Sequence, residues 1–430
     1  MTSANLTFRR LTIEGWRQFE AVDIDLHPTL TVITGANGSG KSTLLNIFSQ
    51  HFGSSRPYLA TPKRVSGGSY RYLVGLFESI WRRTPSHITQ IGSLQYSNGT
   101  TVQLNLSDNQ SVQYNLSFTQ QAVFGFHVGS HRVLPVYRLV GQIQTQPILP
   151  EQAYGLVQSE TNAHYTGQHT GFSPTYRIKE ALISMATFGQ GNQYVQGNSV
   201  VLNSFLGFIE ALRKILPESL GFLDISIRIP DVVLITKSGE FLIDAASGGI
   251  MALIDLAWQI YMYSLGKSEF VVTIDEPENH LHPSMQRSLM RNLIQAFPQV
   301  QFIIATHSPF MVSSVRDSNV YILDYRRQPT IEQSSNIEPQ ALDPSQTQRV
   351  TSTKLDTVNR AGSAGEILRE VLGVPATIPV WVEENLEQIV MRYRARQLTT
   401  EMLGTLRTEL SNLGYGELYP EALAALTRGK

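Results

Sequence analysis

The stretch Gly35-Ala-Asn-Gly-Ser-Gly-Lys-Ser-Thr43 constrains the fold of this chain more than any other feature of its sequence. It fits the pattern G-x-x-x-x-G-K-[ST]. A β-rich apolar run, Leu30–Thr34, precedes it, and a run with helical spacing, Ser42–Phe52, follows it. Glycines in such a turn let successive backbone N–H groups face one anion, and the positive end of the next helix dipole faces the same anion. The sequence therefore predicts a P-loop, a strand–loop–helix unit that binds nucleotide phosphates.

Each residue of the predicted P-loop has an expected task. We expect the Lys41 ammonium to contact the β- and γ-phosphates and the Ser42 hydroxyl to ligate Mg²⁺. The cofactors that the loop predicts are therefore ATP and Mg²⁺. The other loop residues expected to contact the nucleotide are Asn37, Gly38, Ser39, Gly40 and Thr43.

Composition narrows the class of protein. The chain has 430 residues, enough for one large domain or a few smaller ones, and a formal net charge of −1 that gives no bulk preference for nucleic acid or membrane. The absence of cysteine excludes disulfides, thiolate metal sites and cysteine nucleophiles. The N-terminus has no apolar signal region, and no apolar stretch is long enough to span a membrane. We expect a cytoplasmic protein with no membrane partner.

The hydrophobic pattern divides the chain into four parts. Residues 1–53 and 230–325 alternate strands with helices, which predicts an α/β ATPase core with a mixed parallel sheet and helices on both faces. Residues 54–229 interrupt this core and predict an inserted lobe, an antiparallel β subdomain followed by helices. Residues 326–361 are polar and rich in Pro, Gln and Ser, which predicts a linker. Residues 362–430 predict a helical C-terminal region.

An apolar strand ending in two carboxylates supplies the second half of a nucleotide site. Asp275 and Glu276 follow the run Val271–Ile274. An acid at the end of a strand beside a P-loop can hold Mg²⁺, and the next acid can orient or deprotonate the attacking water. We therefore assign Asp275 to the metal and Glu276 to the water. The structural alternative is a turn with two solvated acids.

Two shorter segments add to this pattern. His307 follows the apolar strand Ile303–Ala305 and could contact the γ-phosphate, although a histidine at a strand end is often structural. The segment Ser247-Gly248-Gly249 opens a helix, which is an anion-binding arrangement. Because it is separate from the P-loop, we expect it to bind a nucleotide that is held by a second subunit.

The head of ABC-type ATPases resembles this chain in four elements that follow one another in the same order. They are the P-loop, the Ser247-Gly248-Gly249 segment, the strand ending in Asp275 and Glu276, and the strand followed by His307. The resemblance is to the soluble branch with RecF-like, SMC-like and OLD-type (overcoming-lysogenization-defect) proteins. Three segments carry it most specifically, namely Gly15–Phe19, Glu276–Pro283 and Ala305–Pro309. It covers residues 1–53 and 230–325 strongly and the intervening part loosely.

The resemblance implies roles beyond those that the motifs predict. Two heads are expected to sandwich two ATP molecules, with Ser247 and Gly249 of one head closing over the P-loop of the other. Asn279–His282 is then the loop that crosses the dimer, and Arg17 lies near the nucleotide or DNA. The segment Gly129–Arg132 resembles a Ser-x-Arg segment of these ATPases near the γ-phosphate or lid. No residue corresponds to the lid glutamine.

Three further patterns have competing interpretations. Glu278, His280 and His282 could form a metal triad, but the bracketing prolines favour a loop. Basic and aromatic residues interleave in Arg56–Arg83, which could bind DNA or RNA or could be an ordinary helix with its cationic face outward. The region Ala364–Leu426 is a candidate surface for partner or oligomer contacts, or it packs against its own head.

The leading functional hypothesis is an ATP-binding and ATP-hydrolysing switch that dimerises around ATP or forms a higher oligomer. OLD-type proteins often carry a C-terminal nuclease domain, and the residues after Leu323 contain no Asp-x-Asp for such a domain. We therefore expect a second protein effector, such as a nuclease or toxin, as in PtuA-like ATPase subunits of anti-phage defence systems. The alternatives are a RecF/SMC-like DNA-repair ATPase that binds DNA directly and a slow-turnover, nucleotide-gated scaffold.

Overall fold

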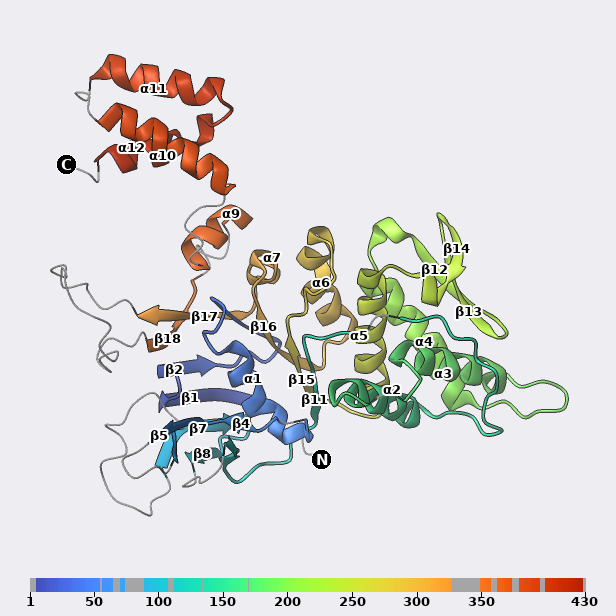
Figure 1. The fold of residues 1–430 in the computed structure, drawn as a ribbon. Helices are drawn as coiled ribbons and strands as arrows, with labels where there is room; N and C mark the ends of the chain where they lie inside the picture. The colour runs from blue at the N-terminus through green and yellow to red at the C-terminus, as the bar shows by residue number, and fades with distance from the viewer. Residues whose placement is uncertain are drawn as a thin grey trace. The chain divides into compact units, whose positions relative to one another are not determined.

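A computed structural model of the chain shows two compact units, Met1–Ile367 and Leu368–Lys430 (Figure 1). The described residues are 5–54, 56–64, 70–73, 89–106, 112–133, 135–168, 170–326, 349–356, 362–372, 379–394 and 399–427.

The larger unit is built on one mixed sheet of 11 strands, in the order β10-β8-β7-β1-β2-β18-β17-β3-β16-β15-β11. The neighbouring strands that pair in parallel at one side are β17 (Asn319–Arg326), β3 (Leu30–Gly35), β16 (Val300–Thr306), β15 (Phe270–Asp275) and β11 (Gly125–Val128). Every residue of β3 and β16 is buried, as is typical of parallel strands covered on both faces. The carboxyl ends of these strands share one edge, which brings the P-loop, the acidic pair and His307 together.

The other side of the sheet is antiparallel. It contains β1 (Phe8–Trp16), β2 (Phe19–Asp25), β7 (Thr89–Tyr96), β8 (Thr101–Leu106) and β10 (Leu116–Ser117). Four strands of the predicted insertion, residues 54–229, extend the main sheet at both edges. The predicted α/β class with a mixed sheet is confirmed.

Shorter strands form small sheets of their own. They are β4 (Tyr58–Leu59) with β9 (Gln113–Tyr114), β5 (Thr61–Arg64) with β6 (Tyr70–Leu73), and β12 (Phe222–Arg228), β13 (Asp231–Thr236) and β14 (Gly239–Leu242). The last group lies within the predicted 230–325 core segment, yet β13 and β14 pair only with each other and with β12 among the described strands. The core of the ATPase sheet therefore resumes at β15.

The larger unit has seven main α-helices among its described residues. They are α1 (Lys41–Ser49), which η1 (Gln50–Phe52) extends, α2 (Pro150–Tyr165), α3 (Pro174–Gly189), α4 (Ser199–Ile215), α5 (Gly248–Ser264), α6 (Pro283–Ala296) and α7 (Pro309–Val312). Helix α1 packs on β3, β15 and β16, and α5 packs against α2, α3 and α4. Figure 1 shows α2 to α5 gathered beside the β11 edge of the sheet. Because α5 is enclosed in this way, it is apolar on nearly all sides.

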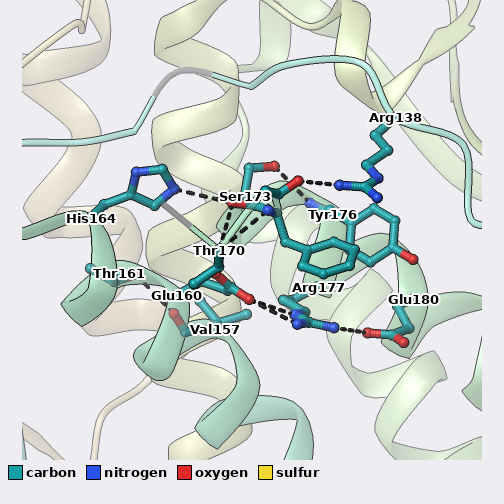
Figure 2. A network of polar contacts seen from close by, with 12 residues as sticks. Arg138, Val157, Glu160, Thr161, His164, Thr170, Ser173, Tyr176, Arg177 and Glu180 are labelled. Atoms are coloured by element: carbon teal, nitrogen blue, oxygen red, sulfur yellow. Dashed lines mark hydrogen bonds and ion pairs between the residues drawn. The ribbon is translucent and has the colours of Figure 1, made fainter. Parts of the chain in front are cut away.

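Buried ion pairs fix this helical layer. The Arg177 guanidinium of α3 lies 2.8 Å from Glu160 of α2 and 2.9 Å from Glu180, and Figure 2 shows it between the two carboxylates. Lys179 is fully buried, and its Nζ donates to Asp231 at 3.1 Å and to Asp244 at 2.7 Å. Since an uncompensated buried charge is costly, these pairs hold α3 against α2 and against the turn that leads into α5.

The predicted linker, residues 326–361, contains a strand of the main sheet. β18 (Arg349–Lys354) pairs antiparallel with β17 and parallel with β2, and Val350 is fully buried in the core. Its β-branched residues suit a strand, but its partner β2 lies far away in the sequence. Residues 327–348 and 357–361 of that interval lie outside the described residues.

The smaller unit is helical, as predicted. α10 (Val380–Arg394), α11 (Thr400–Asn412) and α12 (Tyr419–Thr427) surround an apolar core that includes Leu406 and Leu410. The Arg392 guanidinium and the Tyr393 hydroxyl of α10 both donate to the Glu409 carboxylate of α11. A short segment, α9 (Ala364–Glu366) and the π-helix Ile367–Val371, precedes these helices in the sequence. No described helix has the length and apolar character to cross a lipid bilayer.

Candidate nucleotide site

The P-loop connects β3 to α1 through a turn that requires glycine. Gly35, Gly38 and Gly40 have φ values of 141°, 78° and 100°. A Cβ at Gly35 would lie 2.4 Å from the Leu323 carbonyl oxygen, and one at Gly40 would lie 2.4 Å from Phe19 Cζ. The loop therefore has both the backbone conformation and the close packing that only glycine allows.

Lys41 is buried inside the loop, with 6% of its surface exposed. Its Nζ donates to the carbonyl oxygens of Gly35 at 2.9 Å and Ala36 at 3.0 Å. Burial lowers the pKa of Lys41 to about 8, although the nearby carboxylates, Asp275 first, act in the opposite direction. The ammonium is thus held by neutral acceptors, and phosphate oxygens would be much stronger partners for it.

Binding of ATP is expected to take up a proton when the pH lies above the Lys41 pKa of about 8. The free amine is mostly neutral there, whereas the phosphates favour the charged form and raise the pKa. The affinity for ATP should therefore fall as the pH rises through this range. Titration calorimetry at about pH 8.5, in two buffers of different ionisation enthalpy, should give about half a proton or more per ATP.

The matched control is Lys41→Arg, whose side chain stays charged at this pH. It should bind ATP without the proton uptake. Equal uptake by the two proteins would assign the proton to another group and contradict the location of Lys41 at the phosphates.

The two predicted metal ligands lie together. Asp275 ends β15, and the Ser42 hydroxyl at the start of α1 is close enough to its carboxylate to lower its pKa. Burial raises the pKa of Asp275, and the Ser42 hydroxyl opposes this shift. A hydroxyl and a carboxylate are the hard oxygen donors that Mg²⁺ prefers. The described residues contain no cluster of three or more metal-binding side chains, so phosphates and water would supply the other Mg²⁺ ligands.

Glu276 is held in a strained but accessible position. Its φ is 50°, and its backbone N–H donates to the Ala305 carbonyl at 2.8 Å. Asn279 Nδ2 donates to Oε2 at 2.8 Å, while Oε1 lies 4.0 Å from His307 Nε2. The Glu276 and His307 side chains are each 36% exposed. Positive φ at a residue other than glycine is uncommon and is concentrated at functional sites.

The environment of His307 favours its neutral form. Burial lowers its pKa, and the Lys41 ammonium lowers it further, while Glu276 and Asp275 act in the opposite direction. A neutral imidazole beside the acids can donate or accept one hydrogen bond without adding charge. This position agrees with the predicted contact to a γ-phosphate, and the contact itself stays a prediction.

Glu278 has a role that the sequence did not indicate. Its Oε1 accepts from Thr306 Oγ1 at 2.7 Å, from His307 N at 2.8 Å and from Ser308 N at 3.1 Å. Glu278 therefore fixes the backbone that carries His307. His282 instead caps α6 by accepting from Ser284 N. The alternative metal triad of Glu278, His280 and His282 is wrong, because no metal-binding cluster forms among the described residues.

The Ser247-Gly248-Gly249 segment begins α5, where the Ser247 side chain accepts from Ile250 N and caps the helix. A Cβ at Gly249 would lie 2.8 Å from the His280 carbonyl oxygen, so the segment packs closely on the loop after the acids. The described hydrogen bonds connect Ser247 only to its own helix and not to the P-loop. Its action on a second subunit stays a prediction.

The remaining predicted residues occupy the periphery of the site. The Arg17 guanidinium lies 5.9 Å from the centre of the Tyr58 ring. Its neighbour Gln18 donates from Nε2 to the Gly38 carbonyl at 3.4 Å, a P-loop contact that no motif indicated. In the Gly129–Arg132 segment, the Ser130 carbonyl accepts from Asn279 Nδ2 at 3.0 Å. Most of the predicted Arg56–Arg83 nucleic-acid region lies outside the described residues.

Comparisons with known families agree with this geometry. Residues 10–135 match the protein-family model of an AAA domain, and residues 177–312 match that of an AAA ATPase domain. Both matches are to ATPase-type domains. The two matched ranges contain the P-loop, the acidic pair and His307, which agrees with the predicted ATPase activity. The roles of these site residues stay predictions.

Curated relatives match parts of the ATPase. Septu protein PtuA of Bacillus mycoides (strain KBAB4) is 24% identical over 226 residues, which is 50% of this chain and 30% of the relative. Retron Vc95 probable ATPase of Vibrio cholerae serotype O1 biovar El Tor is 42% identical over 59 residues, which is 13% of this chain and 12% of the relative. The matched segments thus span less than a third of the length of either relative.

Solved structures of SMC heads are also similar to the ATPase. The SMC head domain from Thermotoga maritima has a TM-score of 0.38 at 15% identity and covers 74% of this chain and 95% of that chain. The SmcHead bound to the C-winged helix domain of ScpA has a TM-score of 0.40 at 14% identity, with coverage of 82% and 98%.

Proposed function

We propose that the ATPase is a switch that dimerises around Mg²⁺ and ATP and controls a second protein effector, such as a nuclease or toxin, in anti-phage defence. The observation that carries the proposal is the separation of two anion-binding elements in one chain. The P-loop is at the end of β3, whereas Ser247 caps α5 and Gly249 packs closely on the loop after the acids. A second copy of the chain could bring the two elements onto one nucleotide.

The residues around the P-loop support hydrolysis rather than binding alone. Asp275 contacts Ser42, Glu276 is positioned by Asn279, and Glu278 fixes the backbone of His307. In this proposal, Asp275 and Ser42 hold Mg²⁺, which neutralises phosphate charge, and Glu276 orients the attacking water. His307 contacts the γ-phosphate within its own subunit, and the Ser247 segment of the other subunit closes over the same nucleotide. Loss of the γ-phosphate would therefore weaken the dimer.

The effector and the role in defence rest on relatives named Septu protein PtuA and retron ATPase. Cells that carry the chain with its neighbouring genes should resist phage, and Lys41→Ala should abolish that resistance because the buried ammonium at the phosphates is lost. Plaque counts on matched lawns measure the effect. Lys237→Ala, in the exposed turn between β13 and β14, is the control and should retain resistance.

Two results would contradict this proposal separately. Full resistance with Lys41→Ala would show that nucleotide binding is not required for the switch. Normal plaque counts with the wild-type genes, in cells that contain the folded ATPase, would remove the role in defence while leaving the nucleotide chemistry in place.

A further inference from the structure

A groove of about 840 Å³ lies outside the nucleotide site, between the end of α4 and the helices α6 and α7. Its lining carries four cationic side chains, Arg213, Lys214, Arg287 and Arg291, and one acidic side chain, Glu218. The whole chain has a formal net charge of −1, so the net positive charge of the groove contrasts with a net negative charge on the rest of the molecule.

Three of the four cations are free to bind a ligand. The Arg213 guanidinium donates to the Leu223 carbonyl oxygen and forms an ion pair with the Glu210 carboxylate. The side chains of Lys214, Arg287 and Arg291 are exposed and make no hydrogen bond or ion pair with the part of the chain that the structure describes. Unpaired exposed cations on the two walls of one groove keep their full charge available for an anionic partner.

The spacing of these cations fits a ligand with repeated charges. Arg287 and Arg291 are four residues apart on α6, so they lie on the same face and about 6 Å apart along the helix axis. Lys214 stands near the end of α4 and lines the same groove. Three cations on two helices suit a polyanion, whose repeated charges can contact all of them.

The uncharged lining favours nucleic acid over an acidic protein. Five serines, with Asn292 and Gln295, line the groove, and hydroxyls and amides are common contacts of phosphate and sugar oxygens. Stable protein interfaces have an apolar core in which charged residues are depleted. Phe310 is the aromatic residue among the described lining residues. Interfaces with nucleic acid are more polar and far more positive.

We propose that the groove between α4, α6 and α7 binds the phosphodiester backbone of a nucleic acid. The contact is independent of the ATP-dependent switch and of the Arg56–Arg83 region. Because the groove contacts backbone rather than base edges, binding should have little sequence preference and a strong dependence on salt.

Fluorescence anisotropy of the full chain tests the proposal with three labelled probes of one sequence, a single-stranded DNA, the matching RNA and the DNA duplex. Arg287→Gln with Arg291→Gln should weaken binding of the preferred probe about tenfold or more at physiological salt. The slope of log affinity against log salt should become shallower by about 1.4 for a single strand or 1.8 for a duplex, as expected for two lost phosphate contacts.

The matched control is Arg228→Gln with Lys237→Gln, which removes two exposed cations from the β12–β13–β14 sheet and should bind like wild type. Unchanged ATP affinity in both double variants shows that the nucleotide site is intact. The proposal is overturned if no probe binds the wild-type chain, or if the groove variant and the control bind equally. Binding of poly-glutamate but not of any nucleic acid would assign the groove to an acidic protein and would also overturn it.

Discussion

Glu276→Gln is expected to lower the rate of ATP hydrolysis by about 10²- to 10⁴-fold and to leave MgATP binding close to that of wild type. The amide has the shape of the carboxylate but cannot accept a proton from water. Its oxygen can still accept the hydrogen bond from Asn279, so the local fold should persist. Ser42, Asp275 and Lys41 are unchanged, and the groups expected to hold the metal and phosphates therefore remain.

Phosphate release and equilibrium ATP binding, measured on the same preparations, separate the two effects. Glu269→Gln is the control, because it makes the same change at an exposed acid just before β15. If Glu276→Gln turned over at the wild-type rate, another group would have to position the water. His307 would then be the first residue to test, since its Nε2 lies 4.0 Å from Glu276 Oε1.

The parts of this site that the sequence predicted are those with local signals. The P-loop pattern lies between a strand and a helix that are contiguous with it, and Asp275 and Glu276 directly follow their own strand. Parallel pairing of β3, β16 and β15 then brings these ends to one edge. A short pattern with its flanking elements is enough to predict such a site, because parallel strand pairing positions the ends of the strands.

The features that the sequence did not predict depend on contacts between distant segments. Glu278 fixes the His307 backbone across 29 residues, and Gln18 reaches the Gly38 carbonyl across 20 residues. β18 pairs with β2 although Val350 and Phe19 lie at opposite ends of the larger unit's sequence. Neither polar residues in loops nor a short strand inside a polar segment carry a periodic signal that could have revealed these pairings.

Ser247→Arg is expected to abolish ATP hydrolysis while ATP binding to the P-loop persists. Ser247 is exposed at the start of α5, so the larger side chain can be accommodated in the monomer. In the proposed dimer, the arginine side chain would place extra volume and a positive charge against the nucleotide of the other subunit. Loss of the helix cap alone costs about 1 kcal/mol. Asn198→Ala, which removes the equivalent cap from α4, is therefore the control and should retain activity.

Mixing two inactive variants gives the sharpest test of this composite site. In an equal mixture of Ser247→Arg and Lys41→Ala, half of the dimers contain one chain of each kind. Each mixed dimer has one site that joins an intact P-loop to an intact Ser247 segment, and one site with both defects. Random pairing should thus restore about a quarter of the wild-type activity if the sites act independently. Hydrolysis by Ser247→Arg alone at the wild-type rate would place the segment outside the active site, and an inactive mixture would contradict independent sites shared between subunits.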